Sequence, residues 1–183
     1  MLILQFDGLY REAPQNLNLG AGAGLMCYGW VILRNQSIIA RGHGGYVRGK
    51  EASSNVAEYL ALIEGLEALL DLGAENDPVM ITGDAQSVIN QMQGLASVSA
   101  HSIRPLFRQA RKLFTHFKRA QWCWTPRELN QEADALTRRA LRQLRDNPSH
   151  YEQVLAALSL QGKSKGSNPS RLTPVLDLRL FGI

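Results

Sequence analysis

The chain has 183 residues, 45% of them hydrophobic and 20% charged, a composition typical of a single globular domain with a proper core. It has no apolar run near the roughly 20 residues that a membrane span needs, and its two cysteines are too few to suggest a disulfide framework or a zinc site. The net charge of +4 and the pI near 9.3 are compatible with a nucleic-acid partner but do not require one.

Short apolar segments bounded by turn residues predict three strands at the start of the chain, at 2–6, 31–33 and 37–47. The first segment has no basic region ahead of it, so we expect a strand rather than a signal peptide, and a cytoplasmic protein. A long connection is expected from Gly8 to Gly29, and a hairpin turn at 34–36. These features together predict an antiparallel meander.

The spacing of apolar residues then becomes helical, which predicts a helix over 56–70 that is capped within 53–55 and stopped by Gly73. Further elements follow in order: a strand at 78–83, helices at 84–94 and about 103–117, a strand at 121–125, and a helix from Asn130 to Leu144. The later strands are reached by crossovers and should be parallel. We therefore expect an α/β fold with a five-stranded mixed sheet, three antiparallel early strands and two later parallel strands, flanked by helices.

The periodic signal weakens after residue 146, which divides the chain into a main domain at 1–146 and a C-terminal extension at 147–183. Within the extension we expect a helix at 151–160, a flexible linker at 162–170 and a strand-like tail at 171–183. The tail has two interpretations: it adds a strand to the sheet of a partner, or it packs on its own domain or frays. The second is the simpler one.

Four acids stand at the ends or first turns of the predicted elements. Each has an ordinary explanation: a turn for Asp7, helix capping for Glu58 and Asp84, and an i,i+4 ion pair with Arg138 for Asp134. Their arrangement favours another interpretation, because the carboxyl ends of strands are where α/β sheets bind ligands. Carboxylates that converge beside a core repel one another, and divalent cations relieve that repulsion. Oxygen ligands suit Mg²⁺, and a pair of such ions suits phosphodiester hydrolysis.

Over residues 1–146 the sequence resembles the type 1 ribonuclease H family, in its compact branch without the basic handle. The resemblance rests on four blocks in order: Phe6–Gly8, Asn55–Leu62, Gly83–Gln91 and Trp124–Leu136. It implies a ribonuclease H-like fold and endonucleolytic hydrolysis of the RNA strand of RNA–DNA hybrids by a two-metal-ion mechanism. It further implies 5′-phosphate and 3′-hydroxyl ends, two Mg²⁺ ions with Mn²⁺ as a substitute, and these catalytic, metal-binding carboxylates: Asp7, Glu58, Asp84 and Asp134.

The resemblance also implies substrate contacts. The segment before Glu58 touches the 2′-hydroxyls of the RNA strand in this family, which assigns Ser54 and Asn55 to substrate binding. The backbone amides that follow Asp7 are also expected to contact the hybrid, so Gly8 is assigned to substrate binding as well. Many members carry a histidine in the loop before the last acid, whereas this loop carries Arg127. A guanidinium does not act as a base, so Arg127 is expected to handle phosphate.

Two more departures bear on hybrid binding. The basic handle is replaced by the short segment 94–102, so affinity is expected to be lower or to depend on an arginine-rich helix face at 138–145, which is otherwise an ordinary solvated face. The loop after Asp7 is longer than usual. Its glycine run at 20–24 lacks the spacing of a nucleotide-binding motif, and no helix follows it.

Two competing functions remain. A proofreading-type exonuclease would begin with Asp-x-Glu, but Leu9 stands where the Glu would be. The alternative function is a catalytically weak module that binds hybrids or other nucleic acids with the same fold. Loss of a carboxylate would mark it, and all four are present. We expect a monomer without a membrane partner, with the C-terminal tail as the segment for any contact with a second copy or a partner.

Overall fold

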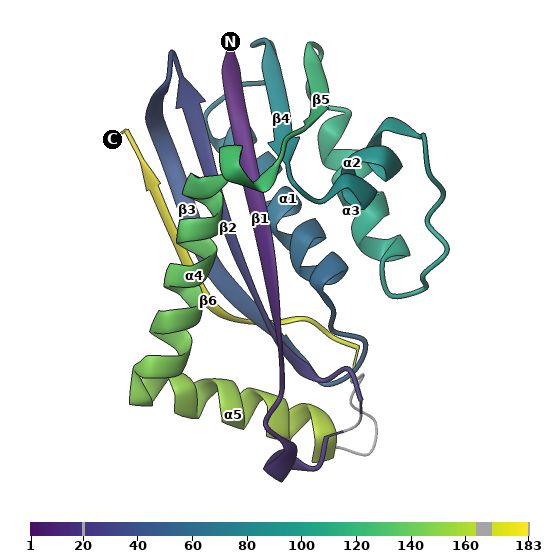
Figure 1. The fold of residues 1–183 in the computed structure, drawn as a ribbon, viewed down its shortest axis with the longest axis vertical. Coiled ribbons are helices and arrows are strands. Elements are labelled where there is room, and N and C mark those ends of the chain that lie inside the picture. Colours follow the sequence, from purple (N-terminus) through teal and green to yellow (C-terminus); the bar gives the residue numbers. More distant parts are fainter. Residues whose placement is uncertain (20, 164–169, 183) are drawn as a thin grey trace.

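A single mixed sheet organises the computed structural model, which describes residues 1–19, 21–163 and 170–182. β1 (Leu2–Glu12), β2 (Gly24–Arg34) and β3 (Ser37–Arg48) form an antiparallel meander. β4 (Val79–Gly83) pairs parallel with β1, and β5 (Ala120–Trp124) pairs parallel with β4. The mixed α/β sheet flanked by helices is as predicted (Figure 1).

The first two strands are longer than the sequence pattern indicated. β1 continues past Asp7 to Glu12, and β2 already begins at Gly24, so the expected long connection from Gly8 to Gly29 is wrong. The two strands pair over this whole stretch, with Asp7 opposite Gly29. Ladder hydrogen bonds thus hold residues that composition alone assigns to a loop. Asp7 therefore lies inside a strand instead of ending one.

The sheet has six strands, and the expectation of five is wrong. β6 (Thr173–Phe181) pairs antiparallel with β3, which gives the order β5-β4-β1-β2-β3-β6. The tail therefore packs on the sheet of its own chain. Of the linker expected at 162–170, residues 164–169 lie outside the described part of the chain.

Helices cover both faces of the sheet (Figure 1). On one face α1 (Ser54–Asp71), α2 (Gln86–Gln93) and α3 (Arg104–Phe114) enclose the larger core around Leu4, Trp30 and Leu66. On the other face α4 (Gln131–Asp146) and α5 (Pro148–Lys163) enclose a smaller core with Leu25 and Val154. No helix in the described residues is long and apolar enough to cross a membrane.

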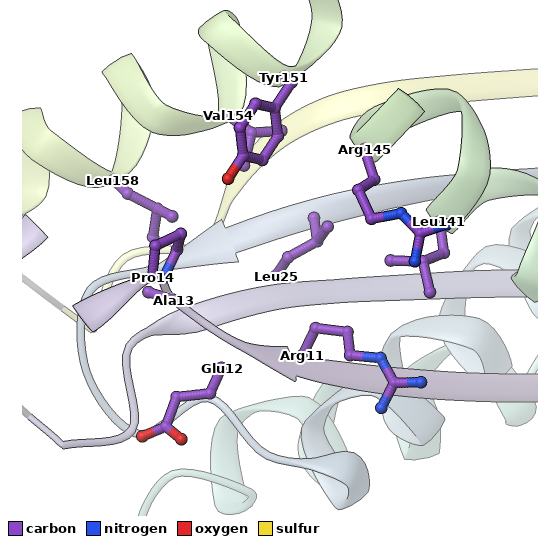
Figure 2. Close-up of a pocket in the computed structure, with 10 residues that line it drawn as sticks. All are labelled: Arg11, Glu12, Ala13, Pro14, Leu25, Leu141, Arg145, Tyr151, Val154 and Leu158. Carbon is purple, nitrogen blue, oxygen red and sulfur yellow. The ribbon is translucent and has the colours of Figure 1, made fainter. Parts of the chain in front are cut away.

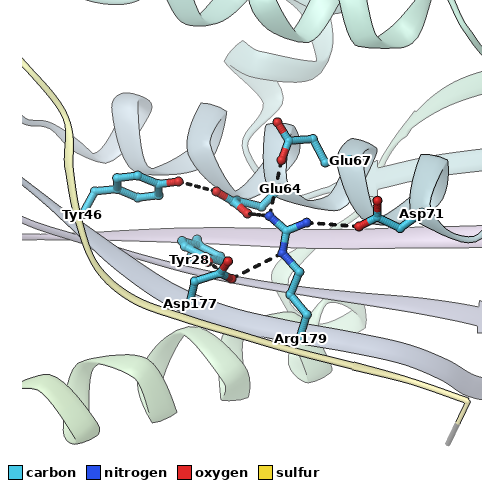
Figure 3. A network of polar contacts seen from close by, with 7 residues as sticks. All are labelled: Tyr28, Tyr46, Glu64, Glu67, Asp71, Asp177 and Arg179. Atoms are coloured by element: carbon cyan, nitrogen blue, oxygen red, sulfur yellow. Dashed lines mark hydrogen bonds and ion pairs between the residues drawn. The ribbon is translucent and has the colours of Figure 1, made fainter.

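An ion-pair network fastens β6 to α1 (Figure 3). The guanidinium of Arg179 contacts Glu64 at 2.6 Å and also reaches three other acids, Glu67, Asp71 and Asp177. The side chain of Glu64 is only 5% exposed, and burial raises its pKa although Tyr46 and Arg179 oppose this. Arg179 is thus the cation that allows a carboxylate to be buried between α1 and the sheet.

Replacing Arg179 with Gln should lower the free energy of unfolding by about 3 kcal/mol, because Glu64 is left as a buried charge without its cation. Urea unfolding measures this loss. A second substitution, Glu64→Gln, should restore part of it. Arg145→Gln, which removes a fully exposed pair with Asp146, is the control and should leave the unfolding midpoint nearly unchanged. Equal losses in both arginine variants would contradict the role of Arg179.

Candidate active site

Three of the four predicted acids converge at the middle of the sheet. Asp7 lies on β1, Glu58 in the first turns of α1, and Asp84 directly after β4. Each offers a carboxylate oxygen, and these oxygens all lie within 4.8 Å of one another. β1 and β4 are parallel neighbours, so the end of β4 delivers Asp84 beside the β1 segment that carries Asp7.

Two glycines let helices approach this part of the sheet closely. A side chain at Gly8 would collide with the α1 backbone at Ala57 and Glu58, and the amide of Gly8 also hydrogen-bonds the Glu58 carboxylate. A side chain at Gly29 would collide with the α4 backbone at Ala133. The glycines thereby bring the two acid-bearing helices against opposite faces of β1 and β2.

Burial and mutual repulsion set the electrostatics of the cluster. Asp7 is 5% exposed, and burial raises its pKa to about 6, with Asp84 and Asp134 adding to the rise. Burial likewise raises the pKa of Glu58 well above its ordinary value, reinforced by Asp7 and Asp84. One oxygen of Glu58, Oε2, is buried and has no hydrogen-bond partner among the described residues. The cluster thus carries more negative charge than the surrounding protein compensates.

Asp134 is outside this group of three and is paired with arginines. Arg127 contacts one of its carboxylate oxygens at 2.5 Å, and Arg138 contacts the other at 2.6 Å. These hydrogen bonds and charges outweigh burial and lower the pKa of Asp134. The i,i+4 pair with Arg138 that the sequence suggested is therefore present, and Arg127 forms a second ion pair with the same acid.

The capping explanations for the other acids are wrong. Ser53 caps α1 and accepts from the amide of Val56, so Glu58 is not half of a capping box. The cap position of α2 is Ala85 instead of Asp84. Neither carboxylate therefore caps a helix.

The sequence did not predict the contacts that three side chains make around the cluster. Asn130 occupies the N-cap position of α4 as expected, but its side chain makes no capping bond. It is fully buried and donates to the carbonyl of Phe6 at 2.8 Å and to Asp84 at 3.5 Å. Thr137 donates to the carbonyl of Asp7 at 3.0 Å, and the indole of Trp124 donates to the carbonyl of Asp84 at 3.0 Å. These bonds run between segments far apart in the sequence, so spacing could not have indicated them.

The residues assigned to substrate binding flank the cluster. Ser54 and Asn55 are exposed at the start of α1, and Ser87 of α2 donates to the side chain of Asn55 at 3.3 Å. Gly8 lies against α1 and contacts Glu58 through its amide. Four arginines on α4 are exposed, which both interpretations of this face require: Arg138, Arg139, Arg142 and Arg145.

An apolar pocket of about 230 Å³ lies elsewhere, between α4, α5 and the end of β1 (Figure 2). Leu25, Leu141, Val154 and Leu158 line it, with Arg11 and Arg145 among the residues at its sides. It shares no residue with the carboxylate cluster. Its lining is mainly apolar and contributes a single carboxylate, that of Glu12, so it offers no group of metal ligands comparable to the acidic site.

The donor set of the acidic site fits Mg²⁺. All its ligand candidates are carboxylate oxygens, which hard cations prefer. A cation bound here would contact the buried Oε2 of Glu58, which has no hydrogen-bond partner among the described residues, and would offset the burial that raises the pKa of Asp7. Asp7, Glu58 and Asp84 are therefore the residues that would hold a metal ion, with Asp134 beside them.

In the metal-free protein, the ionisation of Asp7 should make the free energy of unfolding larger at about pH 5 than at about pH 7.5. The folded-state pKa of about 6 lies above the ordinary 3.8, so folding favours the protonated acid and its stability contribution falls as pH rises between these values. Between pH 5 and pH 7.5 this shift lowers the free energy of unfolding by about 1.4 kcal/mol, which is part of the roughly 3 kcal/mol lost over the whole range from well below pH 3.8 to well above pH 6. Urea unfolding in EDTA measures it.

Asp7→Asn is the matched comparison, because it removes this pH dependence and keeps the shape of the side chain. Buried His43, whose pKa burial lowers, works in the opposite direction in both proteins and cancels from the difference. An identical pH dependence of stability in the two proteins would contradict the buried-cluster electrostatics.

Comparisons with known proteins agree with this geometry. The family described as reverse transcriptase-like matches residues 21–140. Ribonuclease HI of Halobacterium salinarum is 35% identical over 136 residues, which cover 74% of this chain and 62% of that protein. The bifunctional protein Rv2228c of Mycobacterium tuberculosis is 31% identical over 140 residues, 76% of this chain. The chain spans about a third of the length of the mycobacterial relative (35%).

Solved structures give the same result. RNase H1 of Halobacterium salinarum superposes with a TM-score of 0.64 at 33% identity, covering 78% of this chain and 98% of that one. The N-terminal RNase H domain of Rv2228c gives a TM-score of 0.65 at 29% identity, covering 76% and 92%. LC11-RNase H1, solved in complex with an RNA/DNA hybrid, shares the fold with a TM-score of 0.66 at 24% identity, covering 78% and 98%. With its carboxylates, its topology and these relatives in agreement, the chain belongs to the ribonuclease H family.

Proposed function

We propose that the chain is a metal-dependent endoribonuclease that hydrolyses the RNA strand of RNA–DNA hybrids. The observation that carries the proposal is the group of three carboxylates whose oxygens lie within 4.8 Å of one another, with a buried oxygen of Glu58 left unpartnered. The relatives named ribonuclease HI and RNase H1 supply the substrate class. A protein of the same fold is solved with an RNA/DNA hybrid.

The carboxylates act as catalytic ligands in this proposal. Asp7, Glu58 and Asp84 would hold Mg²⁺, with Mn²⁺ as a substitute, and Asp134 would complete a site for two ions. Bound metal supplies a polarised water as nucleophile and positive charge for the attacking and leaving oxygens. Asp7 must be deprotonated to serve as a ligand, which favours activity above about pH 6. The expected products carry 5′-phosphate and 3′-hydroxyl ends.

The substrate is positioned by neighbouring polar groups. Ser54 and Asn55 are exposed beside Glu58, where hydroxyl and amide groups can pair with 2′-hydroxyls and so select RNA. Gly8 follows Asp7 directly and would contact the substrate through its backbone. Arg127 is 60% exposed next to Asp134, so its guanidinium reaches both that acid and solvent, where a phosphate would lie.

The first test is cleavage of an end-labelled RNA–DNA hybrid with Mg²⁺ and with EDTA, beside single-stranded RNA, duplex RNA and duplex DNA. Metal-dependent cutting of the RNA strand of the hybrid is the expected result. Tight binding of the hybrid without cutting under Mg²⁺ or Mn²⁺ would replace this proposal with the alternative of a binding module.

Asp84→Asn should reduce cleavage about 1,000-fold or more, because a neutral amide weakens the metal site, while the fold is kept. Asp146→Asn, an exposed acid at the end of α4, is the control and should cut at the rate of the unmodified protein. Rates on the labelled hybrid and circular dichroism spectra check both parts. Near-normal cutting by Asp84→Asn would contradict the site assignment.

Arg127→Ala should lower the cleavage rate roughly tenfold through loss of a cation beside the scissile phosphate. Arg127→Lys should retain part of the rate, since it keeps the charge without the planar fork. Calorimetry of Mg²⁺ binding provides an independent readout: freeing Asp134 from Arg127 should strengthen metal binding while the rate falls. An unchanged rate in Arg127→Ala would remove Arg127 from the site.

A further inference from the structure

The outer edge of β6 has no paired strand among the residues that the structure describes. β6 is the last strand in the sheet order, and within the described part of the chain β3 is its only paired neighbour. Figure 1 shows it as the yellow strand along the outer edge of the sheet. A strand in this position presents a row of backbone donors and acceptors that another strand can pair with.

The two faces of β6 differ in chemistry. Leu178 and Leu180 are 43% and 55% exposed, although they are large and apolar. They alternate with Asp177 and Arg179, which point to the α1 side of the sheet. Single exposed leucines are ordinary, but two on an open edge strand form an apolar stripe that pairing would cover.

The strand is complementary to itself. If a second copy lies antiparallel with Leu178 opposite its own counterpart, Asp177 lies opposite Arg179 of the second copy, on both sides of the two-fold axis. Leu176 then lies opposite Leu180 of the second copy. Opposite charges and apolar pairs directly across an antiparallel ladder are both stabilising. We propose that β6 is a homodimer interface, in which two chains join their sheets through β6 centred on Leu178.

Of the neighbouring registers, only this one pairs opposite charges on one face of β6 and leucines on the other. Shifting it by two residues places Asp177 opposite itself or Arg179 opposite itself, and like charges there are unfavourable. Shifting it by one residue places leucines opposite charged side chains. An isologous contact of this kind closes as a pair, so it does not propagate into a fibre.

Backbone hydrogen bonds and covered leucines supply the affinity. The cross-strand ion pair contributes less, because Arg179 already binds Glu64, Glu67 and Asp71. Its role is to select the register. One strand per chain is a small interface, so the dimer should be concentration-dependent, with a dissociation constant on the order of micromolar.

The carboxylate cluster is untouched by this pairing. Asp7 lies on β1, and β2 and β3 separate that strand from β6. The dimer would thus carry two open sites. Association is measured by mass, without any cleavage assay, so its failure is distinguishable from failure of the proposed nuclease function.

The test is the molar mass of the full chain by sedimentation or light scattering from about 1 µM to about 200 µM, a range that brackets micromolar affinity. The mass should rise from 20.3 kDa toward twice that value. Leu178→Lys and Leu178→Glu should each stay monomeric, since like charges meet at the two-fold axis. Mixing the two variants should restore the dimer, because opposite charges then meet there.

Leu160→Lys is the matched control, because it places the same charge on another exposed leucine, which is 72% exposed on α5. It should dimerise like the unmodified chain. Circular dichroism checks that each variant folds, and recovery in the mixture shows it independently. A chain that is monomeric at every concentration, or a Leu178→Lys variant that dimerises unchanged, would overturn the proposal.

Discussion

Repulsion among buried carboxylates is the constraint on which the rest of this structure depends. Asp7, Glu58 and Asp84 bring ligand oxygens within 4.8 Å of one another, although burial already raises the pKa values of Asp7 and Glu58. A fold optimised for stability alone would separate them or give each a cation. The chain does so for Asp134, which has two arginines, and for buried Glu64, which has Arg179. Arg127 is near enough for its charge to act on Asp7 and Glu58, but none of the three clustered acids forms an ion pair within the described residues, and a divalent ion would compensate their charge.

The scaffold fixes the acids in place despite this cost. Gly8 and Gly29 let α1 and α4 contact the sheet from opposite faces, and any larger residue would separate them. Buried Asn130 joins the start of α4 to β1 and to Asp84, while Thr137 joins α4 to Asp7. Asp7, Glu58 and Asp134 thus sit on a strand and on helices, and Asp84 lies in the short connection between β4 and α2, where Asn130 and Trp124 hydrogen-bond to it. This keeps their geometry constant before metal or substrate arrives.

Much of this was predictable from the sequence, and what was missed has physical causes. Helical spacing around Val56 and Leu66 and the short apolar strands indicated the mixed sheet, with its later strands parallel as expected. The extent of β1 and β2 was missed because pairing across the ladder overrides the loop-like composition around Gly24. The strand-like tail was predicted, but its place as the sixth strand of the sheet was not, because the alternating pattern gave no sign of which edge it would join. The contacts of Asn130 and Thr137 join distant segments, which no local pattern encodes.

The account is tested most directly by calorimetric titration of the protein with Mg²⁺ near pH 6, in two buffers that differ in ionisation enthalpy. Carboxylates whose pKa is raised by burial and mutual repulsion must give up protons when the ion binds. The account predicts saturable binding accompanied by proton release, with both lost in Asp84→Asn. Binding without proton release, or no binding at all, would contradict the claim that the carboxylate cluster is a metal site.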